Sequence, residues 1–156
     1  MKKVIVIIGV FALSIIFVGV SYAGTSTGSL TVTAAIPATC SILSGSLSFG
    51  SYNNTSGNTA TGTAMTLTCS NGTEYWIYTT IPYLERVMTR EGGGGTLPYK
   101  VYKDDASTEL GIDKDSGLHG VSAGLPTNVI LFGSIAAGLN PPVGNYSHTL
   151  TITVEY

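Results

Sequence analysis

Charged side chains are scarce in this sequence of 156 residues. They make up 10% of the chain, against about 25% in a typical soluble domain. Lysine and arginine number seven in all and never gather into a basic patch, so the electrostatic footprint of a nucleic-acid-binding protein is missing and we expect no nucleic-acid partner. Threonine, serine, glycine and tyrosine take the place of charge. Such a surface suits a protein that packs against copies of itself.

The sequence also lacks the motifs that carry catalysis or bind a metal. Its two histidines, His119 and His148, are accompanied by neither a Gly-x-Ser-x-Gly nor a His-Glu-x-x-His pattern. We interpret both as exposed, unengaged side chains. Segment 113–117 places two carboxylates two residues apart, as in a calcium loop, but it has no third ligand at the usual step. We expect a solvated turn there, and no enzymatic activity, cofactor or metal.

Cysteine is limited to Cys40 and Cys69. They form no Cys-x-x-Cys redox pair, and a zinc site would need further Cys or His ligands at short spacing. In an oxidising compartment an isolated pair usually forms a disulfide. The bridge would close a loop of about 30 residues and stabilise the fold by roughly 3–4 kcal/mol. We therefore predict a structural disulfide.

The only long hydrophobic run lies at the N-terminus. It spans residues 4–20, follows the positive start 1–3, and leads to the small residues Ser21 and Ala23, a pattern typical of a cleaved signal peptide. A transmembrane anchor is the alternative, since the run is nearly long enough to cross a bilayer, but no positive cluster follows it. We predict a signal peptide at residues 1–23 and export. Removal of its two lysines leaves five basic and nine acidic residues, 5 − 9 = −4.

Beyond the signal peptide, apolar residues alternate with period two between clusters of turn-forming residues, which is typical of β-strands. We predict strands at 30–36, 65–69, 75–78, 97–101, 128–132 and 146–156. The turn-rich segments are 51–62, 92–95, 113–124 and 137–144. Seven or so short strands at this spacing indicate an all-β sandwich, which we assign to residues 37–156.

The first alternating segment, 24–36, is special because signal cleavage would leave it at a free N-terminus. Its apolar positions are Leu30, Val32, Ala34 and Ile36. Such a strand could pair within its own domain or detach and pair elsewhere. At the other end the alternation runs to Tyr156, so we expect a sandwich that lacks an edge partner. Supply of that strand by a neighbouring chain is donor-strand complementation.

Several segments occur in an order shared with one protein family. They are 30–36, Leu47-Ser48-Phe49-Gly50, 60–63, 67–73, Arg86-Val87-Met88, 97–104, 132–135, 144–147 and 151–156. In this order, over residues 29–156, the chain resembles the spore coat U domain family, whose better-understood members are the archaic chaperone–usher pilins. Two segments depart from the family pattern: 79–83 lacks an Asp/Gly turn, and Leu110-Gly111 stands where a Trp-Gly often occurs.

The resemblance implies an incomplete immunoglobulin-like β-sandwich with one disulfide, completed by donor-strand exchange. A periplasmic chaperone would hold the fold open, and the N-terminal strand of the next subunit would then replace the chaperone's strand. Leu30, Val32, Ala34 and Ile36 are the expected donor residues. The implied partners are copies of the chain or related pilins, the chaperone and an outer-membrane usher. The implied location is a pilus on the cell surface, serving adhesion and biofilm formation.

Two other functions remain open at this stage. The same strand exchange could build a spore or cell-surface coat. Alternatively, the nine tyrosines and Trp76 could form the platform of a monomeric carbohydrate-binding module, although core packing uses the same residue types.

Overall fold

The computed structural model describes residues 22–62, 65–103 and 107–156. Its contacts divide the chain into two units, Met1–Ala34 and Ala35–Tyr156, which are described separately below. The expected signal peptide, 1–23, lies almost entirely outside the described residues and stays a prediction. In the described part of the chain, no helix is both long and apolar enough to cross a membrane.

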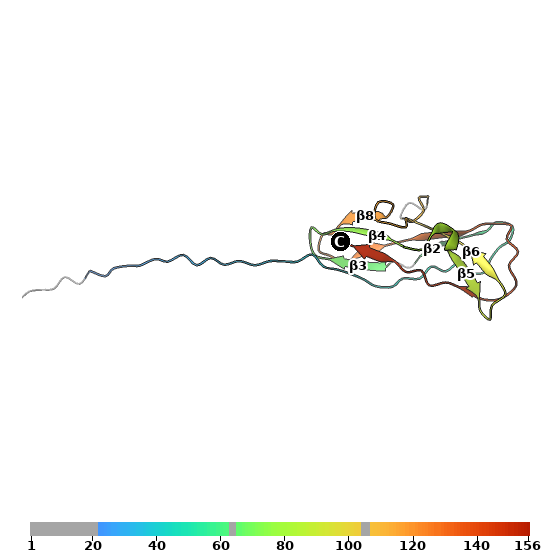
Figure 1. The fold of residues 1–156 in the computed structure, drawn as a ribbon, viewed down its shortest axis with the longest axis horizontal. Coiled ribbons are helices and arrows are strands. Elements are labelled where there is room, and N and C mark those ends of the chain that lie inside the picture. Colours follow the sequence, from blue (N-terminus) through green and yellow to red (C-terminus); the bar gives the residue numbers. More distant parts are fainter. Residues whose placement is uncertain (1–21, 63–64, 104–106) are drawn as a thin grey trace, which may run out of the picture. The chain divides into compact units, whose positions relative to one another are not determined.

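In the first unit, the described residues 22–34 form neither helix nor strand (Figure 1). The side chains of Leu30 and Val32 are 88% and 83% exposed. The alternating segment is therefore extended and unpaired in the single chain. Alternation without a partner leaves large apolar groups in water, an arrangement that favours pairing with another strand.

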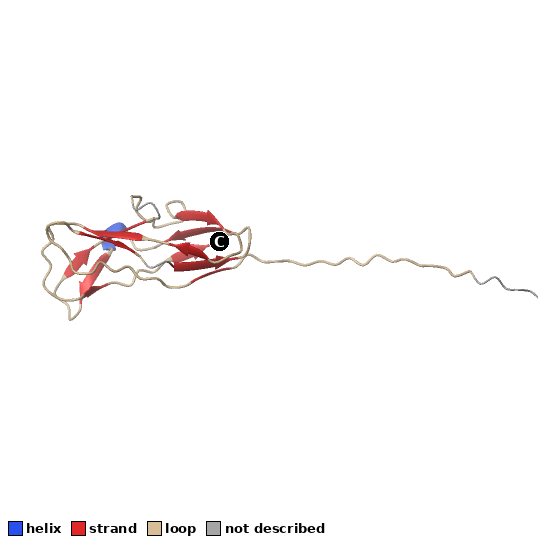
Figure 2. Ribbon diagram, turned by 180° about the vertical axis from the view of Figure 1, so that it is seen from behind, coloured by secondary structure: helices blue, strands red, loops and turns tan. Residues whose placement is uncertain are grey.

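The second unit is built of short strands, with one 3-10 turn, η1 (Tyr83–Glu85), as its helical element among the described residues (Figure 2). The strands are β1 (Cys40–Ile42), β2 (Asn58–Thr61), β3 (Met65–Cys69), β4 (Glu74–Tyr78), β5 (Val87–Arg90), β6 (Thr96–Pro98), β7 (Lys100–Tyr102), β8 (Leu118–Val121), β9 (Thr127–Val129), β10 (Phe132–Ile135), β11 (Tyr146–Ser147) and β12 (Thr153–Glu155). The all-β prediction is confirmed.

Antiparallel ladders join these strands into four three-stranded sheets, in the orders β1-β3-β9, β2-β10-β7, β11-β5-β6 and β12-β4-β8. Strands that follow one another in the sequence can belong to different sheets, so the chain passes from one sheet to another. β9 pairs with β3, whereas β10, three residues further on, pairs with β2 and β7. The strands β5 and β6 lie at one end of the unit, which we call the β5 end. The strands β3, β4 and β8 lie at the opposite end together with the C-terminus, and we call this the C-terminal end (Figure 1).

The core follows from the period-two pattern. In β3 and β4 alternate residues are buried, so that Leu67 and Ile77 point inward and are 2% and 0% exposed. Val101 and Leu110 complete the most deeply buried apolar set, at 2% and 0%. Burial of side chains of this size is worth roughly 1.5–3 kcal/mol each. These contacts hold the sheets face to face.

The predicted disulfide between Cys40 and Cys69 is confirmed. The two residues are direct partners in the β1–β3 ladder. The bridge therefore ties the first strand of the sandwich to the third at the point where the chain enters the fold. The two cysteines are separated by 29 positions in the sequence, which sets the length of the closed loop.

Two turn predictions and three strand predictions were wrong in part. The strand predicted at 97–101 is broken at Tyr99, between β6, which pairs with β5, and β7, which pairs with β10. β2 and β8 lie inside the segments 51–62 and 113–124, predicted as turns. Both are poor in apolar residues, and pairing with β10 and β4 forms them. The strand predicted at 128–132 is broken between β9 and β10, because the chain changes sheets there. The strand predicted at 146–156 is broken between β11 and β12.

Candidate functional site

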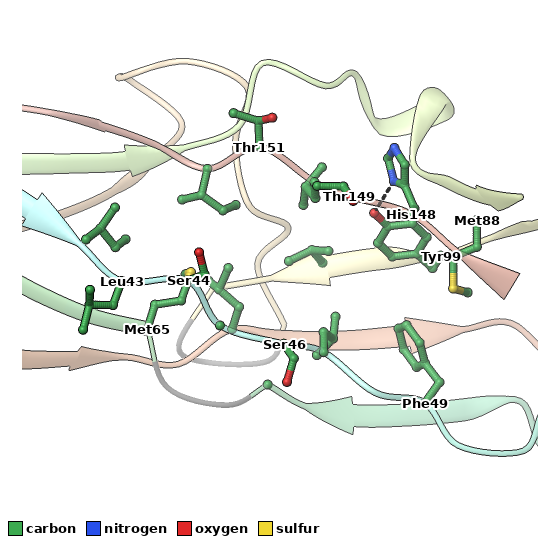
Figure 3. A pocket seen from close by; sticks show the side chains of 18 residues that line it. Leu43, Ser44, Ser46, Phe49, Met65, Met88, Tyr99, His148, Thr149 and Thr151 are labelled. Atoms are coloured by element: carbon green, nitrogen blue, oxygen red, sulfur yellow. Dashed lines mark hydrogen bonds between the residues drawn. The ribbon is translucent and has the colours of Figure 1, made fainter.

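A groove of about 530 Å³ opens along the second unit, between two segments far apart in sequence. One wall is residues 42–49, which continue from β1. The other is residues 148–152, which join β11 to β12. Four buried side chains form the floor: Met65, Tyr99, Val101 and Leu131. We call this feature the edge groove (Figure 3).

Most of each wall of the edge groove lies outside the regular strands, although the Leu43 amide donates to the Thr66 carbonyl oxygen at 2.9 Å. Residues 43–49 and 148–152 belong to no ladder. Within the described residues, β1 pairs with β3 alone and β12 pairs with β4 alone, so each is the edge strand of its sheet. An edge presents backbone N–H and C=O groups that can pair with an added strand. The groove therefore has the architecture of a gap between two sheet edges.

The chemistry of the edge groove suits an uncharged, apolar strand. The lining residues that the structure describes include no Asp, Glu, Lys or Arg. Leu150 and Ile152 of one wall and Ile42 of the other are partly buried against the core, whereas Leu43 is 67% exposed. A segment with alternating apolar residues could bury its inward face here and complete the ladders on both sides.

The β5 end of the edge groove is aromatic and contains the groove's only titratable pair among the described lining residues. Tyr99 Oη and His148 Nδ1 share a hydrogen bond of 2.7 Å, and their ring centroids are 5.8 Å apart (Figure 3). Phe49 meets Tyr99 edge to face at 6.1 Å. Burial raises the pKa of the Tyr99 hydroxyl. The prediction that His148 is exposed holds, but the prediction that it is unengaged is wrong.

One glycine permits the close packing of a groove wall on the sheet beneath it. Gly133 in β10 is buried, and a Cβ at this position would lie 2.6 Å from Leu47 Cδ2 and 2.7 Å from Phe49 Cζ. Real Cβ contacts are not this short, so any larger residue would push both side chains outward. The segments Leu47-Ser48-Phe49-Gly50 and 132–135, both shared with the family, thus meet in one contact between the 42–49 wall and β10.

Arg86 belongs to a segment shared with the family, but its burial was not predicted: it is 1% exposed. Its Nη2 donates to the Leu110 carbonyl oxygen at 2.8 Å, its Nε donates to the Ile81 carbonyl oxygen at 3.3 Å, and its guanidinium lies 4.5 Å from the centroid of the Tyr83 ring. Burial lowers its pKa. Ile81 and Leu110 lie in the two segments that depart from the family pattern. Arg86 therefore holds these two segments together through its hydrogen bonds to their carbonyl oxygens, and we assign it a structural role.

The other candidates noted in the sequence are engaged in local contacts. Asp113 Oδ1 accepts a hydrogen bond from the Ser116 amide at 2.8 Å, as in a capped turn. The Trp76 ring is stacked on His119 at 4.8 Å and lies under Lys114 Nζ at 3.7 Å, so His119 is also engaged. In the described residues, no group of three His, Cys, Asp or Glu side chains could hold a metal ion. Trp76 is half-buried, and its ring is in contact with the His119 and Lys114 side chains.

The four predicted donor residues form no ladder in the single chain. Ile36, like Leu30 and Val32, is highly exposed, at 89%, and Ala34 is exposed as well. A single chain does not test pairing between chains, so this assignment stays a prediction. The sequence did not predict where the receiving site would be, because the edge groove depends on a break in the last strand.

Comparison with known proteins agrees with this fold. Protein U of Myxococcus xanthus is 27% identical, over 93% of this chain and 93% of that protein. A chain in the crystal structure of the CsuC–CsuE chaperone–tip adhesion subunit pre-assembly complex, from archaic chaperone–usher Csu pili of Acinetobacter baumannii, superposes with a TM-score of 0.56 at 18% identity. The match covers 78% of this chain but 40% of that one, and it shows a shared fold. The spore coat protein U domain matches residues 26–153, and this chain belongs to that family.

Proposed function

We propose that the chain is a structural subunit of a chaperone–usher pilus and polymerises by donor-strand complementation. The observation that carries this proposal is the edge groove, a gap between the edge strands of two sheets with an apolar floor and no charged residue in its described lining. In the polymer, residues 24–36 of one subunit fill the edge groove of the next.

The proposed donor matches the groove in chemistry. Residues 24–36 include no charged side chain, and their large apolar side chains, Leu30, Val32 and Ile36, are more than 80% exposed in the single chain. Burial of each would contribute roughly 1.5–3 kcal/mol. Backbone hydrogen bonds to both walls would add to this gain. Such an interface dissociates slowly, because most differences in affinity between complexes reside in the dissociation rate.

The proposal includes a route to the cell surface. An unfilled groove is an aggregation hazard, so a periplasmic chaperone would occupy it until an outer-membrane usher assembles the subunits. The finished fibre would serve adhesion and biofilm formation. The fold shared with a chain of a chaperone–subunit complex supports this route.

A comparison of two neighbouring positions tests the proposal. The full-length chain, exported and purified, should form multimers that resist detergent and collapse on boiling. Val32→Asp should abolish them, because it places a charge on the inward face of the donor. Thr33→Asp, on the opposite face of the same strand, should leave them intact. A wild-type chain that stays monomeric at high concentration would refute the proposal.

A coat protein is the second candidate, and the family description and the relative Protein U favour it. Strand exchange would build either assembly, so multimer formation does not separate them. Immunogold labelling of cells that express the chain does. Thin fibres support the pilus, whereas a uniform layer supports the coat.

A further inference from the structure

The edge groove has different chemistry at its two ends. Toward the C-terminal end, the inward residues of the 148–152 wall are the aliphatic Leu150 and Ile152, which pack against the core. At the β5 end, the corresponding inward position is His148, hydrogen-bonded to Tyr99. Any strand that fills the groove must therefore place one of its residues against a polar, aromatic pair instead of an aliphatic surface.

The direction of an incoming strand follows from the ends of the fold. The chain enters the sandwich at Cys40, which pairs with β3 at the C-terminal end, whereas the 148–152 wall starts just after β11, whose Tyr146 pairs with β5 at the other end. An open fibre needs head-to-tail contacts, since head-to-head contacts close into a dimer. The C-terminal end of one subunit must then face the β5 end of the next. The donor consequently runs antiparallel to residues 148–152, with Ile36 nearest the β5 end.

Three registers place the even-numbered donor residues on the inward face, opposite Leu150, Ile152 and His148. They differ in which residue meets His148: Val32, Ala34 or Ile36. A branched side chain there would overlap the space of the Tyr99–His148 pair, whereas the methyl group of alanine requires the least room. With Ala34 opposite His148, Val32 faces Leu150 and Leu30 faces Ile152, so both large side chains meet aliphatic surface.

We propose that the Tyr99–His148 pair determines the register of strand exchange by accepting Ala34 of the neighbouring subunit. This inference rests on the proposed function and adds a specificity-determining pair to it. A small residue can cover this contact at little cost, because the Tyr99 hydroxyl and His148 Nδ1 are hydrogen-bonded to each other. A larger residue would displace His148 and leave the buried Tyr99 hydroxyl without its partner.

Substitutions at two adjacent alanines test this inference in multimers of the full-length chain. Ala34→Leu should speed the dissociation of the multimers about tenfold, as overpacking of about 1.4 kcal/mol does. Ala35→Leu adds the same volume on the outward face and should change the rate less than twofold. His148→Ala makes room beside Tyr99 and should restore slow dissociation to the Ala34→Leu chain. Circular dichroism of each variant confirms that the sandwich is folded.

Paired cysteines test the register directly. Directly opposite residues on adjacent strands have Cβ atoms about 4.5–5.5 Å apart, within or close to reach of a disulfide. Under mild oxidation, the chain with both Ala34→Cys and His148→Cys should form a covalent ladder of multimers. Chains that combine His148→Cys with Val32→Cys or with Ile36→Cys should cross-link at least tenfold less.

The outcomes separate this inference from the proposed function. If the wild-type chain forms no multimers, both are overturned. If wild-type multimers form but Ala34→Leu dissociates like the wild type, or if cross-links form best through position 32 or 36, the register is wrong and the pilus proposal stands. If His148→Ala fails to rescue Ala34→Leu, the Tyr99–His148 pair does not set the register.

Discussion

The hydroxyl of Ser70 donates a hydrogen bond of 3.1 Å to the carbonyl oxygen of Pro37. The same hydroxyl accepts a bond from the Thr39 amide at 3.2 Å, and the Ser70 amide donates to the Thr39 carbonyl oxygen at 2.9 Å. These contacts lie beside the Cys40–Cys69 disulfide. They fix the course of the chain between the proposed donor segment and the first strand.

Ser70→Ala should loosen residues 37–39 and leave the rest of the fold in place. We expect faster hydrogen exchange at the Thr39 amide and a loss of about 1 kcal/mol in the free energy of unfolding, since an intramolecular hydrogen bond contributes about that much. Hydrogen-exchange mass spectrometry measures the first and chemical denaturation the second. Ser41→Ala is the matched control, because the Ser41 hydroxyl donates a long bond of 3.5 Å to the Thr68 carbonyl oxygen. Equal exchange in both variants would contradict the prediction.

Loss of the disulfide should destabilise the sandwich without removing the edge groove. The bridge spans 29 residues, and a loop of that length is worth roughly 3–4 kcal/mol in the chain-entropy account. We expect the chain with Cys40→Ala and Cys69→Ala to unfold at a clearly lower denaturant concentration than the oxidised wild type. Reduction of the wild type should produce a similar change. A reduced protein as stable as the oxidised one would show that native contacts alone hold β1 to β3.

The sequence was most informative where burial is strictly periodic. In β3 and β4 every second residue is buried, whether its neighbours are the threonines of β3 or the bulky Trp76 and Tyr78 of β4, and both strands were predicted within one residue of their observed bounds. The disulfide followed from the isolation of Cys40 and Cys69 and from the predicted export. These features depend on local pattern and simple chemistry, which a sequence displays directly.

The sequence was least informative where pairing with distant residues decides the structure. β2 has the sequence Asn-Thr-Ala-Thr, with no large apolar side chain, and it forms because β10 pairs with it. Residues 148–152 alternate as well as any strand, yet they leave the ladder and line the edge groove. Alternation alone does not distinguish an edge that is paired from one that is free. The groove could therefore be expected from the family resemblance but not located.

Gly133→Ala should impair multimer formation more than folding. The added Cβ would displace Leu47 and Phe49, which form part of the 42–49 wall. Both side chains end in movable atoms, so we expect the sandwich to remain folded with a narrowed groove and a multimer yield reduced several-fold. Gly138→Ala is the control: this exposed glycine has a φ of 79° and no neighbour within 4 Å, so it strains the backbone without touching the groove. Equal effects of the two variants on multimer yield would contradict the prediction.

The last strand should become less firmly held in acid. Lys114 Nζ and the Tyr78 hydroxyl donate to the Glu155 carboxylate at 2.8 and 3.1 Å. These bonds, chiefly that of Lys114, hold the pKa of Glu155 below its ordinary value of 4.5. A lowered pKa in the folded state means that the stabilisation is fully present above pH 4.5 and is lost as the pH falls through the folded value.

Glu155→Gln should therefore lower the melting temperature near neutral pH, and the difference from the wild type should shrink below pH 4.5. Thermal melts followed by circular dichroism between about pH 3 and pH 7 cover this window. Glu74→Gln is the matched control, since Glu74 is an exposed carboxylate at the start of β4, the strand that pairs with β12. A difference between wild type and Glu155→Gln that stays constant with pH would show that the Glu155 charge does not stabilise β12. The geometry predicts the opposite, because Glu155 belongs to β12 while Lys114 and Tyr78 come from outside it, so its charge joins the last strand to the rest of the sandwich.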